Sequence, residues 1–275
     1  MIQVINVDTV TPTSAPGGTL RTIIGPSTHG TRVEVAIRDV EAGQTARLSP
    51  SDRTQTAYIL DGQGATLART AGGKTSTHQA PRRSGVYLEP GEEAAITAAA
   101  SALTLLLVSV PRHTAKPGAA SPAGYFFEES ALQSLLDERS MRERTFWVNK
   151  ETGLSDSWDL QLGRMRYEPH AYSPRHVHSA SATSPVAPEH FYLIERGTGE
   201  VKHDTGSLPL GPGSLVLIPA GDWHSLISSD SGFDYIEFQG PFDFATRMDV
   251  DALGKNWYIK GTDDGTGKPV RWVQS

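Results

Sequence analysis

The chain has 275 residues, a net charge of −6 at neutral pH and no cysteine. The lack of cysteine excludes disulfides, thiol catalysis, iron–sulfur clusters and Cys-ligated zinc, so any metal must be bound by histidine and carboxylate side chains. An acidic chain without a basic stripe is not expected to bind nucleic acid. The N-terminal residues show no secretory signal, which favours a cytoplasmic protein.

Short apolar segments that end at Gly, Pro, Asp or Asn recur at intervals of about 8–12 residues, a spacing typical of β-sandwiches and barrels. The weakly polar stretch 94–111 is short for a membrane span and contains Ser and Thr throughout. Its second half, TLLLVSV, predicts a buried strand instead. We therefore expect an all-β protein with no membrane partner.

One segment has helical periodicity. Residues 128–141 carry a narrow apolar stripe formed by Ala131, Leu132, Leu135 and Leu136. The segment follows a stretch rich in Pro, Gly and Ala, which is typical of a linker. The pattern predicts a short helix that joins two domains.

The two halves of the chain share a weak internal repeat. In the first half, TAYILDGQGATLA (56–68) is followed by SGVYLEPGEEAAI (84–96), and in the second half HFYLIERGTGEVK (190–202) is followed by GSLVLIPAGDWHSL (213–226). Each pair predicts a strand, a G-x-G hairpin, a returning strand and a strand that runs into a Pro/Gly turn. The repeat indicates two copies of one β-domain.

The repeat and the linker together predict a domain division. We expect an N-terminal domain over 1–118, a linker with a short helix over 119–145 and a second domain over 146–245. The remaining residues, 246–275, are polar and rich in glycine, and predict a tail that packs on a barrel or on a partner subunit.

Most of the nine histidines lie between His170 and His224, and two of them form the sequence His176-Val177-His178. Residues two apart in a strand point to the same face, so both imidazoles can reach one ion. Further along, Pro219-Ala220-Gly221 predicts a bend at the end of a strand, which aims His224 back toward the same site.

These residues resemble the two sequence motifs of the cupin superfamily. The first motif is matched by EPHAYSPRHVHSASATSPVAPEHFYLIERGTGEV, and the second, G-x5-P-x-G-x2-H, by the segment from Gly213 to His224. The resemblance implies two tandem cupin barrels of the jelly-roll type and one divalent metal per chain, bound by His176, His178 and His224. Iron(II) is favoured, with Mn, Ni, Zn or Co as alternatives.

The fourth ligand has two alternatives, Glu189 and His190. The family spacing counted from Gly197 leads to His190, whereas a match of the strand chemistry leads to Glu189 and requires a one-residue bulge. Neighbours in a regular strand face opposite ways, so only one of the two can bind. We favour Glu189, because three His and one Glu is the commoner set in the family.

The first half carries no equivalent ligands. Alignment of the two Pro/Gly turns places Gly91 on Gly221 and Ala94 on His224, and no H-x-H precedes residue 56. The N-terminal domain is therefore expected to be metal-free, with a role in dimerisation or in shaping the site.

Other side chains near the ligands in sequence are candidates for catalysis. Tyr192, Trp223 and Arg175, with Arg166 as a second guanidinium, suit a small anionic or carbonyl-bearing substrate.

The resemblance implies a metal-dependent enzyme, and we expect a mononuclear Fe(II) dioxygenase. A non-redox isomerase, lyase or aminohydrolase similar to ureidoglycine aminohydrolase is the alternative, and a non-catalytic ligand-binding protein is the third. Family members of this kind also suggest a homo-oligomer, a dimer or higher.

Overall fold

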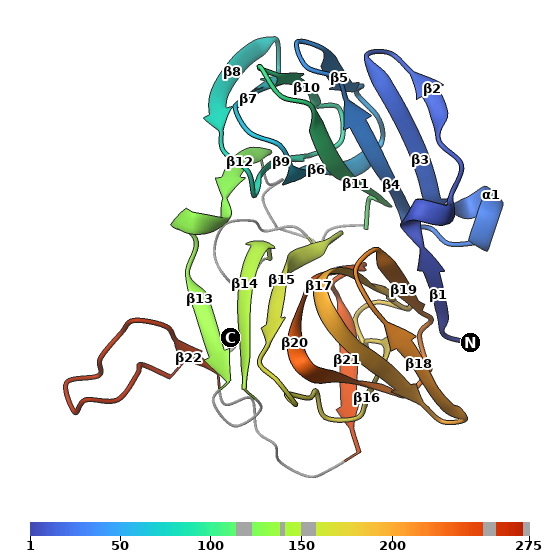
Figure 1. Cartoon of the computed structure of the whole chain (residues 1–275), viewed down its shortest axis with the longest axis vertical. Helices are drawn as coiled ribbons and strands as arrows, with labels where there is room; N and C mark the ends of the chain where they lie inside the picture. The colour runs from blue at the N-terminus through green and yellow to red at the C-terminus, as the bar shows by residue number, and fades with distance from the viewer. Residues whose placement is uncertain (114–122, 138–140, 150–157, 250–256, 272–275) are drawn as a thin grey trace. The chain divides into compact units, whose positions relative to one another are not determined.

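The computed structural model describes residues 1–113, 123–137, 141–149, 158–249 and 257–271, and they fold into two compact units (Figure 1). Almost all regular structure is β-strand, so the all-β class predicted from the sequence is confirmed. No helix among the described residues is long and apolar enough to cross a membrane.

The N-terminal barrel consists of the described residues of Val7–Leu132 together with 158–159. Its strands form a seven-stranded sheet in the order β12-β9-β6-β11-β4-β3-β2 and a four-stranded sheet in the order β5-β10-β7-β8. Both sheets contribute to one apolar core, which includes Ala46 and Ile96 from one sheet and Ala57 and Leu105 from the other. The elements are η1 Val7–Thr9, β2 Thr13–Ala15, β3 Gly18–Ile24, α1 Pro26–His29, β4 Glu34–Val40, β5 Thr45–Leu48, β6 Arg53–Asp61, β7 Ala65–Ala71, β8 Lys74–Ala80, β9 Ser84–Leu88, β10 Glu93–Ala98, β11 Leu103–Pro111, β12 Tyr125–Glu128 and η2 Glu129–Ala131.

The C-terminal barrel consists of Met1–Asn6 and the described residues of 133–149 and 160–275. Its eleven strands form one hydrogen-bonded sheet. The strands are β1 Gln3–Asn6, β13 Ser134–Asp137, β14 Arg142–Val148, β15 Gln161–Tyr167, β16 His176–Ala180, β17 Glu189–His203, β18 Gly206–Leu210, β19 Ser214–Ile218, β20 His224–Gly240, β21 Phe244–Met248 and β22 Tyr258–Ile259.

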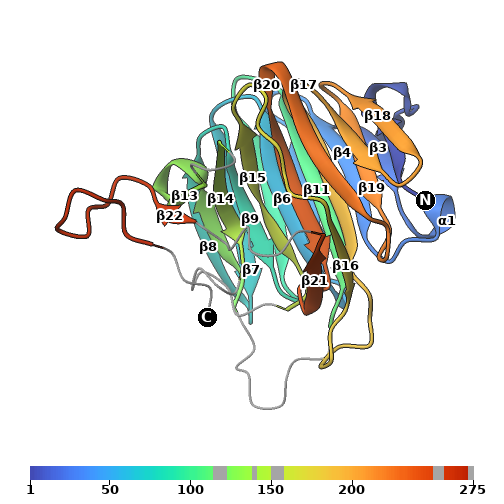
Figure 2. The ribbon, with the colours of Figure 1, turned by 90° about the horizontal axis from the view of Figure 1, so that it is seen from below.

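Two long strands, β17 and β20, connect the layers of this barrel and run side by side in both views (Figure 1, Figure 2). The first part of β20 pairs with β16 and the end of β17, whereas its second part pairs with β15 and the start of β17. Both register shifts of this pair flank Gly197, whose φ is +76°. A Cβ there would lie 2.0 Å from the Gly232 carbonyl oxygen, so the bend requires glycine.

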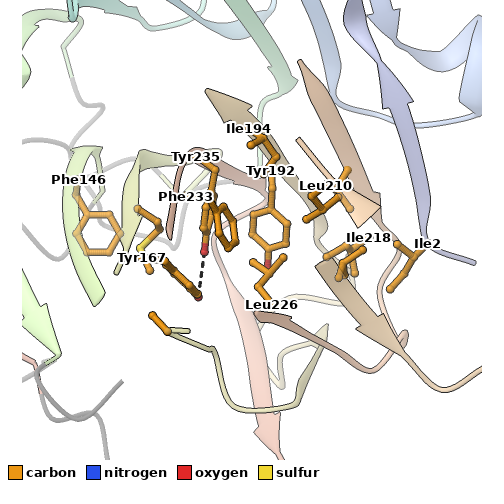
Figure 3. Packing of buried hydrophobic residues seen from close by; sticks show 14 of the residues in the cluster. Ile2, Phe146, Tyr167, Tyr192, Ile194, Leu210, Ile218, Leu226, Phe233 and Tyr235 are labelled. Atoms are coloured by element: carbon orange, nitrogen blue, oxygen red, sulfur yellow. Dashed lines mark hydrogen bonds between the residues drawn. The ribbon is translucent and has the colours of Figure 1, made fainter. Parts of the chain in front are cut away.

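Aromatic side chains fill the inner face of the C-terminal barrel (Figure 3). Tyr192 and Ile194 of β17 lie opposite Glu237 and Tyr235 of β20, because paired residues share a face of the sheet. The Tyr235 hydroxyl donates to the Tyr167 hydroxyl at 3.2 Å. This alternation decides which side chains can reach the inside of the barrel.

The helix predicted over residues 128–141 is wrong. The described part of this segment contains the end of β12, a single 3-10 turn over Glu129–Ala131 and strand β13 over Ser134–Asp137. Leu135 and Asp137 are buried, whereas Ser134 and Leu136 are half-buried, which is the period of two expected of a strand. Pairing of β13 with β14 outweighs the helical spacing of the leucines, and residues 138–140 lie outside the described part.

The division of the chain also differs from the expected boundaries. Residues 3–6 form β1, which pairs with β19 of the C-terminal barrel, and the expected linker 119–145 supplies strands to both units. Within the expected tail, Trp257 is buried in the core of the C-terminal barrel. The second tail tryptophan, at position 272, lies outside the described residues.

Candidate metal centre

The structure brings His176, His178 and His224 together inside the C-terminal barrel. One ring nitrogen from each lies within 4.8 Å of the others. His176 pairs with His224 across β16 and β20, and His178 follows on the same face of β16. The ring centroids of His176 and His224 are 4.2 Å apart, and those of His176 and His178 are 4.9 Å apart.

The Nδ1 atom of each imidazole already has a hydrogen-bond partner. His176 Nδ1 donates to the Pro174 carbonyl at 2.7 Å and His224 Nδ1 donates to the Asp222 carbonyl at 3.0 Å. His178 Nδ1 lies 3.0 Å from the Thr246 hydroxyl. Such bonds fix the ring orientation and leave Nε2 with its lone pair, which is how metal-binding histidines are usually held.

His178 Nε2 is buried and has no hydrogen-bond partner. A buried polar atom without a partner is costly unless something else satisfies it. The arrangement of three such imidazoles fits a divalent transition metal, since neutral imidazole nitrogen suits Fe, Mn, Co, Ni and Zn.

The triad is neutral at neutral pH, which is the form that binds metal. Burial lowers the pKa of His176 to about 4, although the Pro174 carbonyl opposes the shift. Burial, with the neighbouring histidines, also lowers the pKa values of His178 and His224 well below the usual value. The site therefore needs no proton release to accept an ion near pH 7.

The strand β17 places His190, and not Glu189, on the inner face. His190 is buried and its ring centroid lies 4.7 Å from that of His178. Glu189 precedes it in a regular part of the strand and shares the other face with Phe191, which stacks on Phe238. No bulge lies between Glu189 and Ile194, so of the two alternatives for the fourth ligand His190 is on the face of the triad and Glu189, the favoured one, is on the other face.

A buried carboxylate that sequence reasoning missed, Glu237, contacts His190. His190 Nε2 donates to Glu237 Oε1 at 2.9 Å, and Arg144 Nη2 donates to Glu237 Oε2 at 2.7 Å. Burial alone would raise the pKa of Glu237, but the charge of Arg144 and the bond from His190 outweigh it and lower the pKa to about 2. The sequence signal was weak: Glu237 is one of two acids, with Asp234, in the largely apolar run FDYIEFQG.

Tyr192, a predicted catalytic residue, lies beside the triad. Its hydroxyl is 3.3 Å from His190 Nδ1 and 3.3 Å from His224 Nε2. Burial raises the pKa of Tyr192 well above its usual value. The hydroxyl therefore stays protonated and can donate a hydrogen bond inside the site.

The other two predicted catalytic residues, Arg175 and Trp223, lie outside the ligand cluster. Each directly precedes a ligand, so strand alternation turns it to the opposite face. The Arg175 guanidinium stacks on the Trp223 ring at 4.6 Å and forms ion pairs with Asp204 and Asp249, at 2.5 and 2.8 Å. These two residues form a contact on the outside of the barrel and not a wall of the metal centre.

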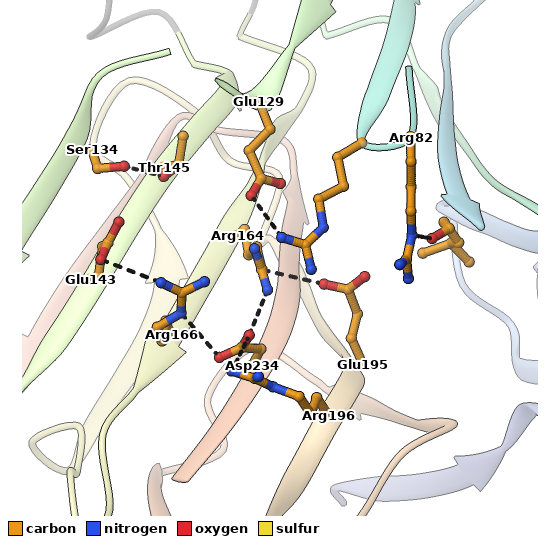
Figure 4. Close-up of polar contacts among 12 residues, drawn as sticks. Arg82, Glu129, Ser134, Glu143, Thr145, Arg164, Arg166, Glu195, Arg196 and Asp234 are labelled. Carbon is orange, nitrogen blue, oxygen red and sulfur yellow. Dashed lines mark hydrogen bonds and ion pairs between the residues drawn. The ribbon is translucent and has the colours of Figure 1, made fainter. Parts of the chain in front are cut away.

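Arg166 pairs with Asp234 across β15 and β20, on the opposite face of the sheet from Tyr167 and Tyr235, and Figure 4 shows its contacts with Asp234 and Glu143. It belongs to a group of three arginines around Asp234, which is only 1% exposed. Arg164 Nη2 lies 2.5 Å, Arg196 Nη2 3.1 Å and Arg166 Nε 3.5 Å from that carboxylate. The prediction that Arg166 lines the substrate site is therefore wrong.

Comparison with known proteins agrees with this architecture. Residues 163–232 match the family model of the cupin domain. The structure is similar to Escherichia coli YlbA, with 16% identity, a TM-score of 0.65 and coverage of 87% of this chain and 90% of that chain. No curated protein matches the sequence.

Two oxalate decarboxylases are also similar in structure. The Lactobacillus farciminis enzyme has 12% identity and a TM-score of 0.70, with 89% of this chain and 88% of that chain covered. The Bacillus subtilis enzyme, which contains Mn(II) centres, has 11% identity and a TM-score of 0.69, with 89% and 78% covered. Residues 163–232 thus match the cupin domain, and the two-barrel fold of the chain is similar to that of these proteins.

Proposed function

We propose that the protein is a metal-dependent enzyme with one mononuclear centre in the C-terminal barrel, and that it acts on a small carbonyl- or carboxylate-bearing metabolite. The observation that carries this proposal is the convergence of three neutral imidazoles whose Nδ1 atoms are bonded elsewhere. A protein that only needed a stable barrel would gain nothing from the buried, unpartnered Nε2 of His178.

We propose Fe(II) dioxygenation as the reaction class. His176, His178 and His224 would hold the iron through imidazole nitrogens, and a bound iron with three protein ligands would have room for a chelating substrate and for oxygen. Because Glu189 lies on the outer face, it does not offer its carboxylate to a metal beside His190.

The residues around the triad have distinct roles in this proposal. Arg144 holds Glu237 ionised, and Glu237 holds His190 with its Nε2 protonated. Tyr192 offers a protonated hydroxyl between His190 and His224. Together they orient an oxygen-rich substrate and exclude water from the inner side of the centre.

A non-redox reaction is the second candidate, because two groups that can hold or move a proton lie beside the triad. These are the Tyr192 hydroxyl and the His190–Glu237 pair. General acid–base catalysis by a Lewis-acid enzyme needs such groups within hydrogen-bond reach of the substrate.

The experiment that separates the two candidates is a substrate screen on protein loaded with Fe(II), Mn(II) or Zn(II), with and without oxygen. A dioxygenase consumes oxygen in proportion to product and is inactive with Zn(II). Turnover without oxygen on the Mn(II) or Zn(II) protein would contradict dioxygenation and favour the second candidate. His176→Ala, which removes one imidazole of the triad, should abolish turnover. The matched control is His29→Ala, which removes an exposed histidine of the N-terminal barrel and should not.

A further inference from the structure

Near the end of β20, Gln239 occupies a position on the inner face of the C-terminal barrel. Across the sheet it pairs with His190 of β17 on one side and with Gln161 of β15 on the other. Residues paired in this way have their side chains on the same face, with Cβ atoms about 5 Å apart. Gln239 therefore lies beside His190, on the face that also carries Glu237.

Gln239 is only 3% exposed, yet its Oε1 atom is buried without any hydrogen-bond partner in the described part of the chain. The neighbouring amide of Gln161 differs, because its Oε1 accepts from Asn149 Nδ2 at 3.4 Å. The large majority of buried side-chain polar atoms in proteins have a hydrogen-bond partner, so a carboxamide oxygen without one needs an explanation.

Neither Glu237 nor His190, its polar neighbours toward the triad, bonds to the Gln239 oxygen. The two oxygens of Glu237 accept from His190 and Arg144, and the His190 Nε2 proton is used in the first of these bonds. Apart from His178 Nε2 of the triad, the described part of this inner face thus presents an uncommitted acceptor in the Gln239 oxygen, and an acceptor calls for an N–H or O–H donor.

We infer that Gln239 is a specificity-determining residue whose Oε1 accepts a hydrogen bond from an N–H or O–H group on the molecule bound at the histidine triad. This inference rests on the proposed function and narrows it. The substrate class becomes a carboxylate or carbonyl chelator with an amide N–H or a hydroxyl next to its chelating oxygens. A chelator with an apolar group there leaves the Gln239 oxygen unpaired and binds less tightly.

The test compares two isosteric chelators on the full-length protein loaded with Co(II). Oxamate and pyruvate both offer a carboxylate and an adjacent carbonyl oxygen, but oxamate carries NH2 where pyruvate carries a methyl group. Dissociation constants follow from the change in visible Co(II) absorption. We expect the ratio of the pyruvate to the oxamate dissociation constant to be about tenfold larger for the Co(II) protein than for Co(II) in water, which corresponds to ~1.4 kcal/mol.

Two variants locate the cause of that preference. Gln239→Met removes the amide at similar volume and should bring the oxamate preference down to the aqueous value. Gln161→Met alters the neighbouring amide on the same face, whose oxygen is already bonded, and should leave the preference in place.

Each outcome has a defined meaning. If neither chelator changes the Co(II) absorption of the wild-type protein, the proposed function itself is contradicted. If both bind with the aqueous ratio, or if Gln239→Met keeps the wild-type preference, only the role of Gln239 is overturned. Equal loss in both variants also overturns it. If Gln239→Met does not bind cobalt, the inference is judged on the wild-type protein alone: an oxamate preference above that of aqueous Co(II) supports it, and an equal preference overturns it.

Discussion

The two barrels share a turn and a strand register but differ in what their inner faces carry. Gly91 and Gly221 have φ values of +85° and +87° in the two Pro/Gly turns. Three residues later, Ala94 pairs with Leu48 in the N-terminal barrel, whereas His224 pairs with His176 in the C-terminal barrel.

The difference extends along the neighbouring strands. By the pairing of β6 with β9 and β11, Gln55 and Ala57 occupy the positions that His190 and Tyr192 occupy in β17. Likewise, Leu107 stands where Glu237 stands in β20. One scaffold thus tolerates an apolar and a polar inner face, so the polar residues of the C-terminal barrel are not needed for the fold.

The largest effect, on metal affinity, is expected when the histidines of the C-terminal barrel are replaced by the residues at the equivalent positions of the N-terminal barrel. In His176→Leu/His224→Ala the two paired ligands become the residues found at the equivalent positions, Leu48 and Ala94. We expect metal affinity to fall by more than ~100-fold, because removal of two ligating imidazoles costs more than removal of a group that only hydrogen-bonds to a ligand. The apo protein should unfold at a temperature near that of wild-type apo protein, because a paired Leu and Ala already pack in the other barrel.

A smaller but still large effect is expected at the carboxylate that supports His190. Glu237→Gln removes the charge paired with Arg144, and we expect a loss of about 10–100-fold in metal affinity or activity. Glu200→Gln, on the outer end of β17, is the matched control.

Variants at position 237 also distinguish an effect on stability from an effect on function. Glu237→Leu alone leaves the Arg144 guanidinium without its carboxylate partner and should lower the free energy of unfolding by ~3–5 kcal/mol. The double variant Arg144→Met/Glu237→Leu should regain much of that free energy, because neither charge remains. Recovery of activity in this double variant would contradict the role given to Glu237.

A third comparison tests the register of β17. His190→Ala should reduce metal content or shift the Co(II) spectrum, whereas Glu189→Ala should leave both unchanged, because the strand places only His190 on the inner face. Loss of metal in Glu189→Ala would show a bulge that the structure does not contain.

Local spacing along a strand could be read from the sequence, whereas pairing between distant strands could not. His176, His178 and His224 could be found because their spacing is local and their turn has a sequence signature. Glu237 could not, because it reaches His190 only through the pairing of two strands that are far apart in the chain.

Two errors had physical causes that local patterns do not reveal. The leucine spacing of residues 128–141 fits a helix, but strand pairing with β14 and β22 decides the structure of the described part. Arg175 and Trp223 adjoin ligands in sequence, but successive side chains in an extended segment point to opposite faces, so adjacency to a ligand does not place a residue in the site.

The smallest expected effect contrasts two glutamates, one in each barrel. Burial raises the pKa of Glu89 to about 7, whereas that of Glu237 is lowered to about 2. A raised acid pKa makes the folded state bind its proton more tightly, so the contribution of Glu89 to stability is present below pH 4.5 and is lost as the pH rises to about 7.

The pH dependence of unfolding checks this contrast. Glu89→Gln should melt higher than the wild type at pH 8 and close to it at pH 5, a gain of ~1–3 kcal/mol at the higher pH. Glu93→Gln, an exposed neighbour, should show no such gain. An equal change at both pH values would mean that the Glu89 carboxyl does not titrate in this range.

The most direct test of the histidine centre is X-ray absorption spectroscopy of the Co(II)-loaded protein. We expect one cobalt per chain with scattering from at least three imidazoles, and loss of this signal in His176→Leu/His224→Ala. Bound cobalt whose imidazole scattering is unchanged in that variant would contradict the central claim, because the metal would then lie elsewhere in the protein.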